Sequence, residues 1–269
     1  MGVNRRDFLK IAGISAAALG VKPAVDAIAS EHKEAVPERG LDAPVGAFSL
    51  AQRYAMVIDV KKLTAEDYEA CAAACHRVHN VPDIRKSDGS VDVMHEVKWI
   101  WRDEYENVFP EQANPFADEI TAHKDFLVLC NHCDSPPCVR VCPTQATWKR
   151  ENDGIVVIDM HRCIGCRFCM AGCPYGSRSF NWSDPRPFIK ETNPTYPTRM
   201  KGVVEKCNFC VERLAKGLFP ACVEACKSGA LTFGDLESPS STVRELLRKH
   251  HTIRRKPSLG TGPNIFYIV

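Results

Sequence analysis

Fourteen cysteines in a chain of 269 residues are the first feature of this sequence that could do chemistry. Twelve of them fall into three groups of four, and the other two, Cys71 and Cys75, stand apart in the stretch EACAAACHR. Cysteines hold metals and iron–sulfur clusters, form disulfides or act as nucleophiles, and their spacing helps to distinguish these uses. The spacing therefore has to be explained first.

The central group has the spacing C-x2-C-x2-C-x3-C-P, which is the bacterial ferredoxin pattern for a [4Fe–4S] cluster. Its members are Cys163, Cys166, Cys169 and Cys173, followed by Pro174. Three thiolates two residues apart let one tight loop wrap three corners of the cube, and Gly165 relieves crowding in that loop. The fourth cysteine, where the chain is expected to turn into a helix, points away and ligates a neighbouring cluster.

Two related groups flank the central one. They are Cys130, Cys133, Cys138 and Cys142, with C-x2-C-x4-C-x3-C-P, and Cys207, Cys210, Cys222 and Cys226, with C-x2-C-x11-C-x3-C. The rival metal is zinc, because paired C-x2-C also builds zinc ribbons. In all three groups a fourth cysteine follows the third after three residues, and a zinc ribbon does not need this cysteine. A zinc-stabilised scaffold protein is therefore the lower alternative.

The segments between the groups predict the fold class. KDFLVLC and GIVVIDMHRC are short β-rich runs that lead into cysteine loops, and Asp153-Gly154 forms a turn before the second. The succession of strand, cysteine loop and short helix occurs twice, as an internal repeat. We predict an α+β fold of tandem bacterial two-cluster ferredoxin-like domains with loop insertions and a signal peptide.

Residues 1–29 have the features of that signal peptide. Arg5 and Arg6 precede Phe8-Leu9-Lys10, an apolar run covers 11–21, and a small-x-small pattern follows. This order is typical of a twin-arginine signal, which exports proteins already folded, and a general secretory signal is the alternative. The apolar run is too short for a membrane span. The formal net charge of +2 comes from this segment alone, so no nucleic-acid partner is expected.

Three stretches carry a family resemblance that covers most of residues 51–235. They are CNHCDSPPCVRVCPTQAT, GSRSFNWSDPRPFIKETNPTYPTRMKGVVEKCNFC and RRKPSLGTGPNIFYIV. They resemble the four-cluster ferredoxin-like iron–sulfur subunits of membrane-bound oxidoreductases. Within that family the resemblance is closest to the periplasmic subunits of a sulfite-reductase-associated membrane complex.

The resemblance implies an electron-transfer subunit of an oxidoreductase complex, without a catalytic site of its own. It would work in the periplasm or on the outer face of the cytoplasmic membrane, peripheral to the membrane, in a respiratory complex linked to sulfur metabolism. Its partners would be an integral membrane quinone-binding subunit and a multihaem cytochrome c or other redox subunit. The alternative is the electron-transfer subunit of a molybdopterin reductase of the polysulfide or thiosulfate type.

The stretch that holds Cys71 and Cys75 departs from the family pattern. Leu63 occupies the place of a first cysteine, two residues are inserted, and only the third and fourth cysteines remain. Thr64 and Asp67 predict a capping box, so a helix should replace the cluster loop, with the two cysteines one turn apart on one face. We therefore expect the family's first cluster to be absent and three [4Fe–4S] clusters to remain.

The family's pairing of cysteine groups implies which thiols hold each cluster. Cluster A would take Cys130, Cys133, Cys138 and Cys173; cluster B would take Cys163, Cys166, Cys169 and Cys142; cluster C would take Cys207, Cys210, Cys222 and Cys75, with Cys226 as the alternative to Cys75. Cys71 would then be unligated and would face Cys226, either in a disulfide or as a buried apolar thiol. A second interpretation of Cys71–His76 is haem attachment, for which the spacing is one residue too long.

The implied domain organisation has six parts. They are a signal peptide (1–29), an N-terminal arm (30–50), a first ferredoxin-like half that has lost one cluster and kept one (51–90 with 200–235), an insertion (91–123), a second ferredoxin-like domain with two clusters (124–190), and a C-terminal helix and tail (236–269). The insertion, rich in aromatic residues, is either a docking surface or an aromatic cover for the cluster domain. His132 either donates to a cluster sulfide or packs within its loop.

The C-terminal segment leaves one further alternative open. Thr242 and Glu245 predict a second capping box at the start of a helix. The final residues NIFYIV then either contact a membrane surface or add a strand to the subunit's own core.

Overall fold

The computed structural model describes residues 51–112 and 124–269. The predicted signal peptide, the N-terminal arm and the end of the 91–123 insertion lie outside the described residues. Within the described ranges, no helix is both long and apolar enough to cross a bilayer.

A four-stranded sheet brings the start and the end of the described chain together. Its central strand β1 (Tyr54–Asp59) pairs antiparallel with β8 (Leu231–Asp235) and parallel with β10 (Ile265–Ile268). The edge strand β9 (Thr252–Ile253) pairs antiparallel with β10. The final residues therefore form a strand of the core, which is the second of the two alternatives for NIFYIV.

The two faces of β1 serve different parts of the core, because successive side chains of a strand point to opposite sides. Met56 and Ile58 face the main apolar cluster that also holds the cysteines of helices α3 (Ala65–His79) and α9 (Ala221–Ala225). Ala55 and Val57 pack against Val243 of helix α10 (Thr242–Lys249). Both faces are thus covered, and every residue from 54 to 58 is buried.

Three two-stranded ribbons complete the strands. They are β2 (Ile100–Glu104) with β3 (Asp125–Leu129), β4 (Thr147–Lys149) with β5 (Val156–Ile158), and β6 (Ser179–Phe180) with β7 (Val204–Glu205), all antiparallel. β3 and β5 are the two β-rich runs that the sequence places before cysteine loops. Mixed helix and strand content is as predicted.

α3 (Ala65–His79), the longest helix among the described residues, lies where the family pattern would have a cluster loop with Cys71 and Cys75. The predicted capping box is confirmed: the backbone amide of Asp67 donates to Thr64 Oγ1 at 3.3 Å, and the backbone amide of Thr64 donates to Asp67 Oδ2 at 3.0 Å. Cys71 and Cys75 are both buried on the face that packs against α9 (Ala221–Ala225).

The short helices correct two details of the sequence-based prediction. In each complete group the helix starts beside the third cysteine and ends before the fourth, so the fourth cysteine follows the helix. These helices are α6 (Pro137–Arg140), α7 (Phe168–Ala171) and α9. In α10 (Thr242–Lys249) the N-cap is Ser241, without a side-chain capping bond, so the predicted Thr242–Glu245 box is wrong.

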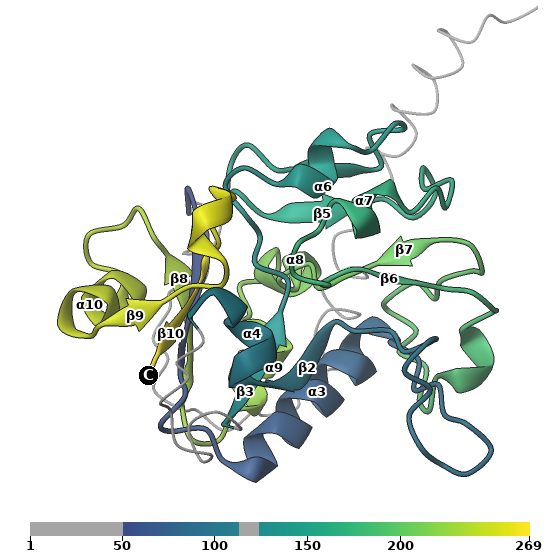
Figure 1. Ribbon diagram of the computed structural model, residues 1–269, viewed down its shortest axis with the longest axis horizontal. Coiled ribbons are helices and arrows are strands. Elements are labelled where there is room, and N and C mark those ends of the chain that lie inside the picture. The colour runs from purple at the N-terminus through teal and green to yellow at the C-terminus, as the bar shows by residue number, and fades with distance from the viewer. Residues whose placement is uncertain (1–50, 113–123) are drawn as a thin grey trace, which may run out of the picture. The chain divides into compact units, whose positions relative to one another are not determined.

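The remaining described helices are single turns: α4 (Tyr105–Val108), α8 (Val211–Leu214) and the 3-10 helices Pro110–Gln112, Arg186–Phe188 and Pro257–Leu259. Figure 1 shows α6, β5 and α7 together at the top, and α3 below β2.

The described part of the 91–123 insertion contributes aromatic side chains to the core. Trp99 and Phe109 are buried, and the Phe109 ring packs edge-on to Phe126 and Tyr267 at centroid distances of 5.1 and 5.4 Å. These contacts favour the cover over the docking surface, since the rings are not available to a partner.

Candidate metal centres

Two cavities are lined by cysteines from two different groups. The first is lined by Cys130, Cys133, Cys138 and Cys173, and the second by Cys142, Cys163, Cys166 and Cys169. In each case three thiols come from one loop and the fourth from the end of the other loop's helix.

A third set of thiols lies in the protein interior. Cys75, Cys207, Cys210 and Cys222 are all buried. Burial raises the pKa of Cys222 to about 12, and burial together with the neighbouring Cys207, Cys210 and Cys222 raises the pKa of Cys75 well above its usual range. Such thiols bind as thiolates only beside a strong positive charge, which bound metal supplies.

Cys71 and Cys226 lie against each other beside this third set. The proximity of the two thiols raises the pKa of Cys71 and lowers the pKa of Cys226 to about 6. Cys71 Sγ also donates to the carbonyl oxygen of Cys222 at 3.2 Å. The structure thus groups Cys75 with the other three thiols of the third set and pairs Cys226 with Cys71.

The same placement bears on haem attachment at Cys71–His76. Both cysteines face the interior between α3 and α9, with Cys71 fully buried and Cys75 5% exposed. A thioether link needs both sulfurs at the edge of an open haem site, so this packing argues against that interpretation.

The three C-x2-C loops share one backbone feature that the sequence does not reveal. The residue just before the second cysteine has a positive φ in each: His132 at 42°, Gly165 at 70° and Phe209 at 54°. Only glycine adopts this conformation without strain. The side chains of His132 and Phe209 stack on each other, with ring centroids 3.8 Å apart and ring planes 20° from parallel. This contact holds both loops in the same turn.

Whether a cluster fits the first cavity can be judged from the buried hydrogen-bond donors around it. Asn131 and Arg178 line that cavity. Among the described residues Asn131 Nδ2 has no hydrogen-bond partner, whereas the Arg178 guanidinium interacts with the thiols of Cys138 and Cys169. An unsatisfied buried donor is costly, so an acceptor is expected there. The sulfides and thiolates of an iron–sulfur cluster are such acceptors.

His132 is a further orphan donor close by. Its Nδ1 accepts from the backbone amide of Val156 at 3.1 Å, and burial holds the pKa of the imidazole well below its usual range. The ring proton therefore lies on Nε2, which is buried and has no partner among the described residues. The ring stacks on Phe209 of another cysteine loop and accepts from the backbone, and it also retains a donor without a partner among the described residues.

The three sets of thiols follow one another through the molecule. Cys138 of the first cavity lies near enough to Cys169 of the second cavity to raise the pKa of Cys169. Cys130 of the first cavity likewise lies near enough to Cys207 of the third set to raise the pKa of Cys207. Arg178 is buried near Cys138 and Cys169, between the two cavities. The order is therefore second cavity, first cavity, third set, and then the Cys71–Cys226 pair.

Zinc is a poor fit to these sets. A tetrahedral zinc site brings its sulfurs within about 3.8 Å of one another, given Zn–S bonds of about 2.3 Å. Among the described residues, which include all fourteen cysteines, the ligand atoms of only one group of three or more potential ligands lie within 4.8 Å of one another: His79, Cys210 and Glu212. His79 Nε2 is already hydrogen-bonded to Glu212 Oε1 at 2.5 Å, and no four-cysteine set is that compact.

A buried polar network that the sequence did not indicate surrounds the third set. His79 Nδ1 contacts the carbonyl oxygen of Cys75 at 3.0 Å, and the imidazole stacks on Trp99. Arg199 forms a buried ion pair with Glu205 at 2.7 Å and donates to the carbonyl oxygen of His79. These partners come from segments more than a hundred residues apart, so no local pattern could have identified them.

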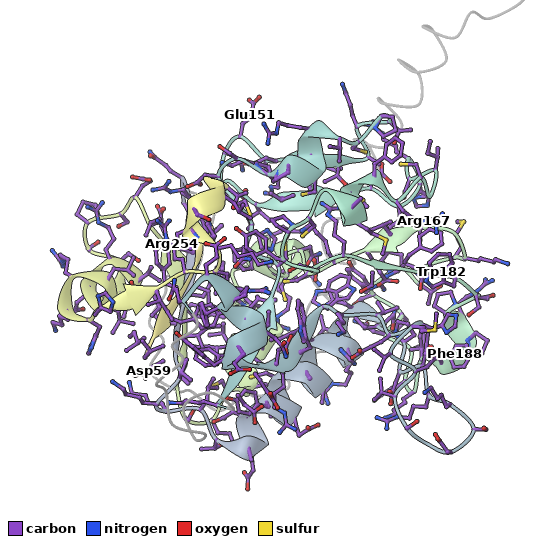
Figure 2. All side chains as sticks on the ribbon, in the orientation of Figure 1. Asp59, Glu151, Arg167, Trp182, Phe188 and Arg254 are labelled. Atoms are coloured by element: carbon purple, nitrogen blue, oxygen red, sulfur yellow. The ribbon has the colours of Figure 1, made fainter. Side chains whose placement is uncertain are left out.

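The second cavity opens towards an apolar rim on the surface. Ile164 is 67% exposed and Phe168 is 59% exposed, and both belong to the loop that carries three of its thiols. Arg167 lies over the ring of Trp182 at 4.8 Å, and Figure 2 shows these two side chains on the same edge of the molecule. The third set, by contrast, is buried.

Comparison with known proteins agrees with this geometry. The family model described as a 4Fe-4S dicluster domain matches residues 123–186 and 192–236. The Hdr-like menaquinol oxidoreductase iron-sulfur subunit 1 of Archaeoglobus fulgidus is 38% identical, over 98% of this chain and 97% of its own length. A tetrathionate reductase subunit of Salmonella typhimurium is 34% identical over 100% of this chain and 89% of its own length.

A third relative is the menaquinone reductase iron-sulfur cluster-binding subunit of Nitratidesulfovibrio vulgaris, 36% identical over 80% of this chain and 88% of its own length. The fold and the cysteine sets define a ferredoxin-like [4Fe–4S] protein. The chain belongs to the family of iron–sulfur subunits of oxidoreductase complexes, as the sequence resemblance predicted.

Gly165→Ala should remove the metal from the second cavity. A methyl group there would overlap the carbonyl oxygen of Gly202, and the residue has a φ of 70°. We expect the iron content to fall by about four atoms per chain, because a [4Fe–4S] cluster cannot assemble in a displaced loop. Iron and acid-labile sulfide assays after anaerobic purification measure this.

The matched control is Gly176→Ala, which has a similar φ of 65° but no atom within 4 Å of the added methyl. It should keep its full iron content. Equal iron loss in both variants would show that backbone strain, and not the contact with Gly202, causes the effect.

Proposed function

We propose that this chain is an electron-transfer subunit that carries three [4Fe–4S] clusters between a quinone-reactive membrane subunit and another redox subunit. The observation that supports this most strongly is the row of three four-thiol sets, each within electrostatic reach of the next. A chain of one-electron centres is what electron transport needs, and it requires no substrate-binding site of its own.

The proposed ligands are the twelve cysteines that the structure groups in fours. Cluster A is held by Cys130, Cys133, Cys138 and Cys173, cluster B by Cys142, Cys163, Cys166 and Cys169, and cluster C by Cys75, Cys207, Cys210 and Cys222. The two cysteine-lined cavities support the first two sets, and the mutual pKa effects of four buried thiols support the third. When bound, the clusters supply the one-electron redox chemistry.

The protein's own groups would tune these centres. The buried Arg178 guanidinium between clusters A and B stabilises the more negative, reduced state of both, and so raises their potentials. Backbone amides donate to thiols of the third set, from Phe209 to Cys207 Sγ at 3.5 Å and from Ala221 to Cys210 Sγ at 3.4 Å, with the same sign of effect.

Cluster B is the proposed point of exchange with a partner. Its loop is exposed and apolar at Ile164 and Phe168, as a redox interface that excludes water would be. A multihaem cytochrome c is the proposed partner at one end of the row and a quinone-binding integral membrane protein at the other. The relatives named menaquinol oxidoreductase and menaquinone reductase subunits support the quinone connection.

The proposed setting is the periplasm or the outer face of the cytoplasmic membrane, in a respiratory complex linked to sulfur metabolism. The twin-arginine pattern at Arg5 and Arg6 supports export in the folded state, after cluster assembly. The name of the tetrathionate reductase relative connects the family with sulfur compounds.

A second candidate function is favoured by the same relative and by the arsenate respiratory reductase iron-sulfur subunit of Shewanella, which is 37% identical over 80% of this chain. In that case the chain would deliver electrons to or from a separate molybdopterin-containing catalytic subunit. The cluster set would be unchanged, and only the partner would differ.

The ligand set predicts different outcomes for two serine variants. Cys75→Ser should lose about four iron atoms per chain, because Cys75 completes cluster C, whereas Cys226→Ser should keep all its iron. Cys71→Ser, on the same helix face as Cys75, is the matched control and should also keep its iron. Loss of a cluster in Cys226→Ser with full iron in Cys75→Ser would show that the fourth group closes its own cluster.

The electron-transfer role predicts specific companions. The chain, tagged and purified anaerobically from its native membranes, should co-purify with an integral membrane protein, and a reduced quinol added to that complex should bleach the visible iron–sulfur absorbance. The isolated chain should not respond to quinol. Co-purification of a molybdenum subunit would support the second candidate, and a chain that retains clusters but binds no redox protein would contradict both.

A further inference from the structure

Two cysteines have no place in the three sets, yet the fold brings them together. Cys71 lies in the middle of α3 and Cys226 is the C-cap residue of α9, 155 positions later. They are 0% and 4% exposed, and both belong to the main apolar core, in the same buried cluster between the two helices. The buried carboxylate of Asp67, which accepts from the backbone amide of Ser228, lies close to Cys71.

The pair is anchored to its neighbours by specific contacts. Cys71 Sγ donates to the carbonyl oxygen of Cys222 at 3.2 Å, and that oxygen also accepts the backbone amide of Cys226 at 3.2 Å. Cys226 Sγ lies 3.4 Å from the hydroxyl of Ser228. Since Ser228 is half-buried and Lys227 is exposed, the Cys226 end of the pair lies next to solvent.

The position of the pair relates it to cluster C. Cys71 precedes Cys75 by four residues on α3, and Cys226 follows Cys222 by four residues at the end of α9. A bond between the two sulfurs would therefore tie α3 to α9 one helical turn away from two proposed ligands of cluster C.

We propose that Cys71 and Cys226 form a reversible dithiol–disulfide couple that staples α3 to α9 when it is oxidised. The oxidant is a small disulfide such as oxidised glutathione. Cys226 sulfur, reached by local opening at the end of α9, attacks one sulfur of that disulfide and releases one thiol. Cys71 sulfur then displaces the second thiol from the mixed disulfide, so two protons and two electrons leave the pair and two molecules of glutathione are formed.

The staple restricts the motion that would open the cage of cluster C. Loss of iron from that site requires Cys75 and Cys222 to separate, and a cross-link one turn away opposes that separation. Clusters A and B lie on other loops and are not affected. The couple would thus make the retention of one cluster depend on the thiol–disulfide balance around the protein.

The test counts free thiols in the cluster-loaded protein. Anaerobic protein is equilibrated for hours in glutathione buffers of increasing oxidation, then denatured with a chelator and excess N-ethylmaleimide, and its labels are counted by mass spectrometry. We expect fourteen labels in reducing buffer and twelve in oxidising buffer, with a single linked peptide joining Cys71 to Cys226. The number of labels reports on Cys71 and Cys226 whether or not the other twelve cysteines hold clusters, so this measurement does not depend on the proposed function.

Cys71→Ser and Cys226→Ser are the controls, and neither can form the linked peptide. Cys226→Ser should take up thirteen labels in every buffer, whereas Cys71→Ser should take up thirteen in reducing buffer and twelve labels plus one glutathione on Cys226 in oxidising buffer. Fourteen labels on the wild type in the most oxidising buffer, or a linked peptide that joins other cysteines, would overturn the couple. In a second measurement, one third of the iron should pass to a chelator more slowly from the oxidised wild type than from the reduced one, with no such difference in Cys71→Ser. Equal rates in a protein that forms the linked peptide would overturn the stapling role.

Discussion

Burial of cysteine thiols that must become thiolates is the constraint on which this structure depends. The cysteines of the third set and several of the first lie in surroundings that raise the pKa of the thiols, as for Cys133, where burial and the nearby Cys130 bring the pKa to about 12. A cluster of iron cations reverses that preference, because its positive charge stabilises the thiolates. Metal binding and folding of the loops are therefore one process, and the loops are pre-shaped for it by the left-handed residue that each contains.

Exchange of the fourth cysteine between groups explains how the chain is assembled. In the first two sets, each loop supplies three thiols to its own cavity and one to its neighbour's, so neither cavity can be completed by a single loop. The third set extends this principle to α3, which has lost its own loop but still offers Cys75. The sheet fixes that arrangement, since β1 leads into α3, and β8, which follows the group at Cys222, pairs beside it.

The same exchange leaves Cys71 and Cys226 at the end of the row. Relative to the family pattern, the first group lacks two cysteines, and the helix in place of the loop keeps the two remaining thiols on one face. In the proposed arrangement Cys75 serves the neighbouring site and Cys71 meets Cys226, so the proposed chain of electron carriers ends at a thiol pair.

Local patterns in the sequence predicted the elements that depend on nearby residues. Thr64 and Asp67 predicted the start of α3, the β-rich runs predicted β3 and β5, and the cysteine spacing predicted the family. The predicted box at Thr242 was wrong, because Ser241 takes the N-cap position one residue earlier. The stack of His132 on Phe209, the place of Arg178 between two cavities and the network of His79, Arg199 and Glu205 could not be predicted, since they join segments far apart in the chain. The assignment of Cys75 to cluster C stays a prediction that the grouping of thiols supports.

The central claim is that twelve of the fourteen cysteines hold three cubane clusters. Iron and acid-labile sulfide analysis of anaerobically purified, full-length protein, combined with Mössbauer spectroscopy, tests it most directly. The account predicts about twelve iron and about twelve sulfide per chain, all in the [4Fe–4S] state. Stoichiometric zinc without inorganic sulfide, or only about eight iron with Cys75 reactive towards thiol reagents, would contradict it.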